Sequence, residues 1–522
     1  MAKKKLNKNL VIAITLGMFA VMIILSALML RQLQQRDPRY FIELANNAAT
    51  QGHWQQAAVF YEQAWRRSNE AKYLVEVGEM LLRDGDVQNA RVAWHQALVQ
   101  EPGLIEGHVR QLTLLLRMAR LYDAPQDWEA VRDAADTMLE VEAEKTSSQT
   151  AFAHNARGLA LIQLRDRGAD PEEGLGDLQK ACELAQESVD YAIDLAFVFV
   201  RRGDSVTADN TFADMYAMFG PPLSPHEERG GGKGAEASKV RVAYARYLAG
   251  RGKREEAERF LKEAMALSGE DAGALREAKL GYAGLVTQQW ALAMRDPASK
   301  AEATPLFDKA EAILKDCVES DPDAFDAYLQ LAMLYRSAGR YADVVETCEK
   351  RISRGLSRKG VEATQNRVST FTLMIYASEA SVALGITAAQ ENSFVERDRW
   401  LVKAEQYVAD ARGEAPTHPR VLSQAGRVQI ARGRERAGLE ALRAADEGYR
   451  SFGTVNWENR MIRARVHLQL NEAGAARQVL EEVMDDAAKT RGADSAFWNL
   501  YAQTLVQAGE LSRALAMVDR VL

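Results

Sequence analysis

One stretch, from Tyr73 to Pro102, constrains the fold of this chain more than any other feature of the sequence. It contains two segments of helical periodicity, separated by a tight turn at Gly85 and closed by a proline. Small residues lie inside both segments: Gly78 in the first, Ala90 and Ala97 in the second. Small residues within helices let two helix axes approach closely, so the stretch predicts one antiparallel helix pair. A pair of this size cannot bury its own apolar faces and needs copies of itself on either side.

Copies of this unit follow one another from Arg39 to the end of the sequence. The turn at Gly85, for example, follows a similar turn at Gly52. Other units with the same spacing of small residues cover 190–219, 240–264, 327–348 and 497–522. The pattern is weaker, with expected inserted loops, over 105–145, 275–322 and 369–411. Because no stretch alternates with period two for long enough to predict a strand, we expect an all-α chain of ten or eleven helix pairs.

Length and charge narrow the class of protein further. A chain of 522 residues is too long for one compact core, so it is either multidomain or repetitive. Its net charge of −7 is spread over interleaved acids and bases, and no basic stripe is present. Nucleic-acid-binding proteins carry such a stripe, so we expect no nucleic-acid partner.

Residues 10–30 form an uncharged apolar run of 21 residues. As a helix this run is about 31 Å long, which matches the hydrocarbon thickness of roughly 30 Å. A cleaved signal peptide and a buried helix are the alternatives, but the run is longer than a signal core and ends without an Ala-x-Ala site. We therefore expect one transmembrane helix.

Orientation is predicted from the positive charges at the two ends of this helix. More of them precede it than follow it: Lys3, Lys4, Lys5 and Lys8 before, Arg31, Arg36 and Arg39 after. This favours a cytoplasmic N-terminus, with the repeats on the periplasmic side of a bacterial inner membrane.

The predicted organisation has five parts. They are a basic tail (1–9), the transmembrane helix (10–30), an N-terminal array (38–219), a linker (220–237) and a C-terminal array (238–522). The linker is predicted from Gly220–Ala235, which has three prolines and five glycines. Its Gly-Gly-Gly-Lys-Gly run lacks the Ser or Thr and the preceding strand of a phosphate-binding loop.

The three cysteines, Cys182, Cys317 and Cys348, each fall in a predicted helix among small or apolar neighbours. Buried core positions are favoured for all three. A Cys317–Cys348 disulfide is the alternative in an oxidising compartment.

Nothing in the sequence predicts an enzyme. No two of the seven histidines lie four residues apart on one helix, and no nucleophile or dinucleotide-binding motif is present. Paired acids such as Glu255 and Glu256 fall on exposed helix faces. We therefore expect no catalytic residues, metal, cofactor or small-molecule substrate.

The small residues, turn glycines and closing prolines together resemble those of tetratricopeptide repeat (TPR) proteins, over roughly residues 38–522 apart from the linker. The resemblance implies a right-handed superhelical solenoid whose inner surface is lined by the first helix of each pair. In this family that groove usually binds peptides or partner proteins. Carrying the inner-face spacing onto this chain gives eight candidate partner-binding residues: Asn46, Arg83, Phe197, Arg246, Met333, Arg336, Arg427 and Asn499.

A membrane anchor followed by a large repeat array is similar to the layout of bacterial inner-membrane assembly factors. The leading hypothesis is therefore a membrane-tethered adaptor that binds proteins or peptides in envelope assembly, secretion or export. Two alternatives remain at this stage. One is a fixed structural subunit of an export complex, and the other is a docking segment of a longer multidomain protein.

Overall fold

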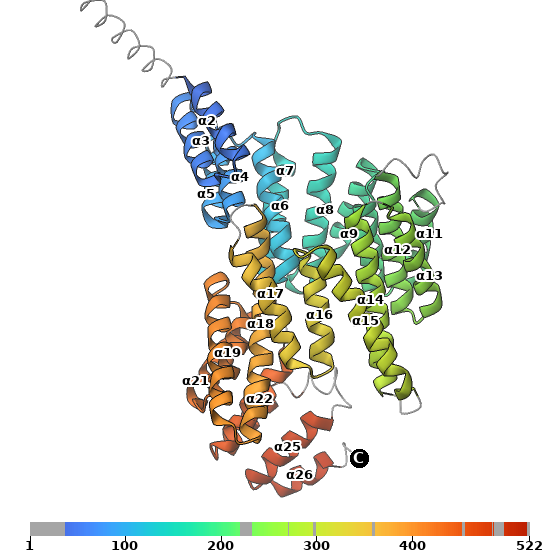
Figure 1. Ribbon diagram of the computed structural model, residues 1–522, viewed down its shortest axis with the longest axis vertical. Coiled ribbons are helices and arrows are strands. Elements are labelled where there is room, and N and C mark those ends of the chain that lie inside the picture. Colours follow the sequence, from blue (N-terminus) through green and yellow to red (C-terminus); the bar gives the residue numbers. More distant parts are fainter. Residues whose placement is uncertain are drawn as a thin grey trace, which may run out of the picture.

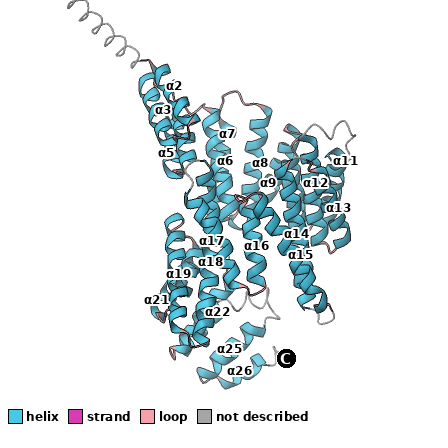
Figure 2. Cartoon of the chain, in the orientation of Figure 1, coloured by secondary structure: helices cyan, strands magenta, loops and turns pink. Residues whose placement is uncertain are grey.

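The computed structural model describes residues 37–219, 232–269, 271–295, 299–357, 361–451, 455–482, 484 and 495–518. Within these residues the chain forms 24 α-helices and no strand, which confirms the all-α prediction (Figures 1 and 2). The predicted tail and transmembrane helix, and residues 220–231 of the predicted linker, lie outside the described residues.

The helices follow one another in antiparallel pairs. The first ten are α2 (Pro38–Thr50), α3 (Trp54–Ser68), α4 (Lys72–Asp84), α5 (Val87–Gln100), α6 (Ile105–Tyr122), α7 (Pro125–Glu140), α8 (Ser147–Gln163), α9 (Pro171–Leu184), α10 (Val189–Arg202) and α11 (Ser205–Phe219), with a 3-10 helix, η1 (Arg165–Arg167), before α9. The others are α12 (Gly232–Gly250), α13 (Arg254–Leu267), α14 (Ala272–Arg295), α15 (Lys300–Ser320), α16 (Phe325–Ser337), α17 (Tyr341–Ser357), α18 (Val361–Gln390), α19 (Phe394–Glu414), α20 (Pro419–Ala431), α21 (Glu435–Ser451), α22 (Trp457–Gln469), α23 (Ala473–Glu481), α25 (Ser495–Gln507) and α26 (Leu511–Val518).

Gly78 acts as the sequence predicted. A Cβ atom added to it would lie only 2.3 Å from Nε1 of Trp94 on the second helix of the pair. The Trp94 ring is fully buried, and its Nε1 donates a hydrogen bond to the carbonyl oxygen of Val75 at 3.0 Å. Gly426 allows the same approach by Leu442 in a later pair. The missing side chain therefore makes room for a large residue of the partner helix.

Several expectations about boundaries were wrong. The described helices form twelve pairs rather than ten or eleven. The turn expected around residues 122–126 is short, because α6 ends at Tyr122 and α7 begins at Pro125. The loop expected over 295–304 is also shorter, since α15 begins at Lys300 and contains Pro305. Helix α12 begins at Gly232, inside the range expected for the linker.

Over much of the array the pairs stack so that a first helix also touches the next first helix. Helix α12 lies against α14, α14 against α16, α16 against α18, and α18 against α20. Packing also continues across the predicted linker, because α11 and α12 lie against each other and share a buried cluster that includes Phe212 and Tyr247.

One long-range contact interrupts this nearest-neighbour arrangement. Helix α18, from the C-terminal half, also lies against α4 and α6, which are first helices of the N-terminal half (Figure 1). Elements almost three hundred residues apart in sequence are therefore side by side. This contact places part of the C-terminal half over the first-helix face at α4 and α6.

Residues Thr370–Gln390 of α18 make up the one described stretch long and apolar enough to cross a membrane, with a mean hydropathy of 1.4. More than half of it, 56%, is buried inside the protein. It packs between α17, α19 and α20, so its apolar character is explained as that of a core helix.

All three cysteines are free thiols, and Cys317 and Cys348 are buried. Burial raises the pKa of the Cys317 thiol to about 11, while the smaller effects of Lys279 and Asp316 oppose each other. The core interpretation of these two residues therefore holds, and the alternative of a disulfide between them does not.

Candidate functional site

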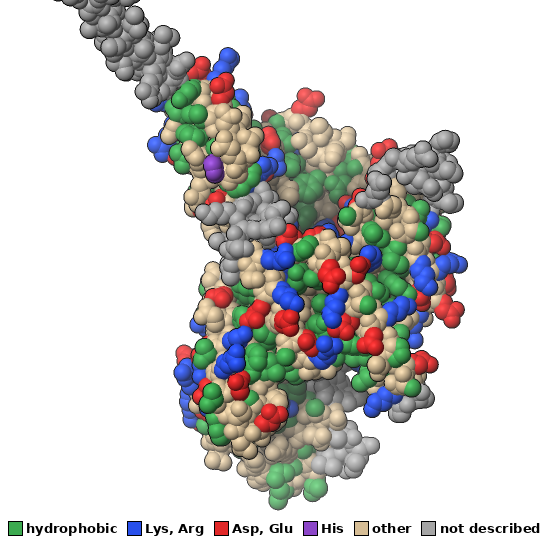
Figure 3. All heavy atoms as spheres, in the orientation of Figure 1, with side chains coloured by type: hydrophobic (Ala, Val, Ile, Leu, Met, Phe, Trp, Pro, Cys, Tyr) green, Lys and Arg blue, Asp and Glu red, His purple; other side chains and the backbone are tan. Residues whose placement is uncertain are grey.

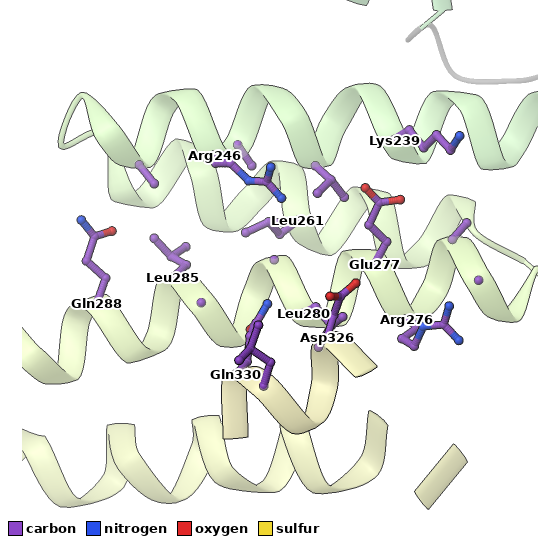
Figure 4. A pocket seen from close by; sticks show the side chains of 18 of the residues that line it. Lys239, Arg246, Leu261, Arg276, Glu277, Leu280, Leu285, Gln288, Asp326 and Gln330 are labelled. Atoms are coloured by element: carbon purple, nitrogen blue, oxygen red, sulfur yellow. The ribbon is translucent and has the colours of Figure 1, made fainter. Parts of the chain in front are cut away.

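A hollow of about 1020 Å³ opens between α12, α14 and α16, three successive first helices (Figure 4). Its volume is at the upper end of the range of ligand pockets, roughly 300–1,000 Å³. Apolar side chains form much of its wall: Val242, Leu261, Leu280, Leu285 and Leu329. We call this hollow the central groove.

Helical spacing explains which residues of α14 line the central groove. Glu277, Leu280, Gly284 and Gln288 recur at intervals of three or four residues, so they share one face of the helix. From Glu277 to Gln288 this face runs for roughly 16 Å at 1.5 Å per residue. One face of α14 therefore forms a wall with an acid at one end and an amide at the other.

Two glycines of α14 shape the central groove differently. A Cβ atom on Gly281 would lie 2.8 Å from Leu261, so this glycine lets α13 pack closely. A Cβ atom on Gly284 would meet nothing within 4 Å. Gly284 therefore leaves open space in the central groove and bares the helix backbone there.

The cations that line the central groove already have partners. Lys239 Nζ lies 3.2 Å from Asp190 Oδ1, and Arg276 forms an ion pair with Asp321. Arg246 lies with its guanidinium carbon 6.0 Å from the centre of the Phe197 ring.

The carboxylates of the central groove are different. Within the described residues, neither Glu277 nor Asp326 makes an ion pair or a side-chain hydrogen bond. Loss of water between the surrounding helices raises the pKa of Glu277. The positive charges of Lys239 and Arg246 act against this rise, while Asp190 and Asp326 add to it. Both side chains are exposed, so the central groove presents two accessible acids that form no ion pair within the described residues.

On the first-helix face of the N-terminal half, polar side chains hydrogen-bond to one another. Arg120 on α6 and Asn155 on α8 both donate to Asp194 Oδ2 on α10, at 2.9 and 3.3 Å. Burial still raises the pKa of Asp194, with Arg120 and Asn155 opposing the rise. These polar groups satisfy one another across three successive first helices, in contrast to Glu277 and Asp326.

Four of the eight predicted partner-binding residues lie on or next to the helices of the central groove. One of them, Arg336 on α16, forms an ion pair with Glu379. Arg246 lines the groove itself and contacts Phe197. Met333, on α16, is 46% exposed. Phe197, which is partly buried, also packs edge-on against Phe212 with ring centres 5.7 Å apart. Binding of a partner by any of them stays a prediction.

The structure does not bring the other four predicted residues together. Asn46 accepts a hydrogen bond from Tyr61, and Arg83 lies beside Glu79 and over the Trp54 ring. Arg427 pairs with Glu458. Asn499 is exposed on α25, far along the chain. They too remain predictions, spread over separate first helices.

Sequence reasoning missed Glu277, Gly284 and Asp326. The signal was present, since Glu277, Gly284 and Gln288 keep the spacing of one helix face. It was overlooked because 275–322 was interpreted as a weak repeat with an inserted loop, so no inner-face residue was assigned to α14.

The described part of the chain contains no group of three or more His, Cys, Asp or Glu residues placed to hold a metal ion.

Three features recur among the described helix pairs: a small residue facing the partner helix, a left-handed turn residue, and contact between successive first helices. Gly78 shows the first, and Gly85, with φ of 95°, shows the second. The same turn conformation recurs at Gly52, Gly203, Gly252, Gly339, Gly433 and Gly509. The fold is a TPR-like array of helix pairs.

Comparison with solved structures finds neighbours with low sequence identity to this TPR-like chain. Yeast Tom70 has 11% identity and a TM-score of 0.37, with 93% of this chain and 91% of that one covered. A human IFIT1 dimer with PPP-AAAA has 15% identity and a TM-score of 0.35, covering 79% and 93%. A thermophilic TPR protein of Thermus thermophilus, TTC0263, has 18% identity and a TM-score of 0.31, covering 42% and 99%. No family model and no curated protein matches the sequence.

Proposed function

We propose that this protein is a scaffold that holds a segment of a partner protein in the central groove. The observation that carries the proposal is the groove itself: three successive first helices enclose about 1020 Å³ with apolar walls and unpaired polar groups. Such a mixture of apolar wall and a few placed polar groups is typical of binding sites.

The charges of the groove favour a protein over a nucleic acid. A phosphate backbone is held by unpaired Lys and Arg side chains. Here Lys239 and Arg276 are engaged in ion pairs, whereas Glu277 and Asp326 are not. Over the face seen in Figure 3, acidic and basic side chains are interleaved.

Photo-crosslinking tests this proposal. A photoreactive amino acid at Gln288, on the exposed groove wall, is expected to form adducts with a partner protein. The variant Gly284→Tyr should abolish them, because a Cβ atom there meets nothing within 4 Å and the attached ring would occupy the groove.

Two controls sharpen this experiment. A Cβ atom on Gly176 of α9 also meets nothing within 4 Å, and the control variant Gly176→Tyr should leave the Gln288 adducts unchanged. The same photoreactive group at Gln179, exposed on α9, should not give those adducts. Adducts that survive Gly284→Tyr would show that the partner does not lie in the central groove.

The membrane part of the function is also a proposal. The apolar run at residues 10–30 supports a single-pass anchor, and the flanking positive charges support repeats on the periplasmic side of a bacterial inner membrane. A superhelical array held there would serve envelope assembly, secretion or export as a tethered adaptor. A reporter fused after Leu522 that is active only in the cytoplasm would contradict this orientation.

A further inference from the structure

The shape of the central groove suits an extended peptide chain. The face of α14 between Glu277 and Gln288 is roughly 16 Å long. An extended chain advances about 3.3 Å per residue, so about five residues would cover this face. The bared backbone at Gly284 and the small residues Ala245 and Ala249 on α12 let a peptide main chain come close to the floor.

The ends of this path differ in chemistry. Glu277 and Asp326 lie on neighbouring walls, α14 and α16, near the beginnings of these helices (Figure 4). At the far end of the α14 face lies Gln288, while Gln330 lies one helical turn after Asp326 on α16 (Figure 4). Both are amides that can donate to and accept from a peptide backbone.

The charge balance then decides what the acidic end would accept. Lys239 and Arg276 are each occupied by a carboxylate outside the groove, Asp190 and Asp321. Among the lining cations, Arg246 is the one for which no ion pair is seen in the described residues. Two lining acids, Glu277 and Asp326, also form no ion pair there. The remaining charge is negative, so a positive side chain complements it and a negative one is repelled.

We propose that the central groove binds an extended segment of a partner protein and places a lysine or arginine side chain between Glu277 and Asp326. This inference rests on the proposed function and adds the chemistry of the bound segment. A charged hydrogen bond to these carboxylates would select such a segment over one with a neutral residue at that position.

Peptide arrays test the inference on the full-length protein. The probes are peptides of about six residues, randomised except for one central position fixed as lysine, glutamine or glutamate. We expect binding of the lysine set about tenfold tighter than binding of the glutamine set, with the glutamate set weakest, as one charge-assisted contact implies. Equal binding of the three sets by the wild-type protein would overturn the inference.

Charge variants distinguish a specific lysine contact with Glu277 and Asp326 from general electrostatic attraction to the protein. Glu277→Gln and Asp326→Asn should each reduce the preference for lysine, and Glu277→Lys should shift it toward glutamate. The control variant Glu396→Gln removes an exposed acid of α19 and should leave the preference unchanged. A lysine preference that persists in the Glu277→Gln/Asp326→Asn double variant would contradict the assignment.

The dependence on pH gives an independent readout. Because the pKa of Glu277 is raised, this carboxylate gains a proton at a higher pH than an ordinary glutamate as the solution is acidified. Its surroundings are Lys239 and Arg246 on α12, Asp190 on α10 and Asp326 on α16. The lysine preference should therefore weaken on acidification before ordinary carboxylates titrate, and it should do so less in Glu277→Gln.

The Gly284→Tyr variant distinguishes the two levels of the proposal. If it blocks every peptide set while the wild-type protein shows no lysine preference, the groove is the binding site and only the charge inference fails. If it changes no binding, or if no set binds the wild-type protein, the central groove is not a peptide site and the proposed function fails with it.

Discussion

At the scale of single residues, a glycine in this protein acts according to what faces it. Gly78 faces the buried ring of Trp94, whereas Gly176 on α9 faces open space. Both lie inside helices, where alanine is intrinsically preferred over glycine by about 1 kcal/mol. Replacing Gly78 by alanine is therefore favoured by helix propensity but opposed by packing. Replacing Gly176 by alanine is favoured by helix propensity and not opposed by packing.

We predict that Gly78→Ala destabilises the protein by about 1–3 kcal/mol, because the new methyl group must displace the Trp94 ring and its hydrogen bond to Val75. Gly176→Ala is the matched control and should be neutral or slightly stabilising. Hydrogen exchange of residues 72–100 measures the effect locally, which suits an array whose repeats need not unfold together. Unchanged protection in Gly78→Ala would contradict the predicted clash.

At the scale of elements, buried hydrogen bonds fix how the first helices of the C-terminal half stack. Gln424 on α20 donates to Ser378 Oγ on α18 at 3.0 Å, and Ser378 in turn donates to the carbonyl oxygen of Ala404 on α19. One step further, Ser423 on α20 donates to Asn459 on α22 at 2.5 Å. These bonds specify the relative position of the helices more narrowly than apolar contacts would.

Replacing Ser378 by alanine should cost about 1–3 kcal/mol, because it leaves the buried amide of Gln424 without its acceptor. Ser381→Ala is a close control. Its hydroxyl is equally buried but bonds only to the Ala377 carbonyl of its own helix. Thermal unfolding of the two variants should differ in midpoint, and equal midpoints would show that the Gln424–Ser378 bond contributes little.

At the scale of the whole molecule, contacts beside the predicted linker and a long-range helix contact hold the halves together. Phe212 of α11 stacks on Tyr247 of α12 with ring centres 4.8 Å apart, across the segment predicted as a linker. Helix α18 lies against α4 and α6. The predicted arrays 38–219 and 238–522 are therefore in contact in the folded protein, whatever the linker between them does.

A protease site inserted after Pro225 tests this arrangement. After cleavage in solubilised, full-length protein, we expect both fragments to elute together in size-exclusion chromatography, because the buried cluster around Phe212 still joins them. The variant Phe212→Ala should weaken their association by removing a fully buried ring. Separation of the unmutated fragments after cleavage would mean that these contacts do not hold the halves together.

The sequence by itself determined the helix pairs, their small-residue contacts and most of their boundaries. These depend on neighbours within about one repeat, such as Gly78 and Trp94, and periodicity records them directly. Only the tertiary structure decided which inner face stays open. Helix α18 lies against α4 and α6 but leaves α12, α14 and α16 around a groove with two unpaired acids. Which first helices meet is set by the small rotation between each repeat and the next, added up over many repeats. No local sequence pattern encodes this accumulated rotation.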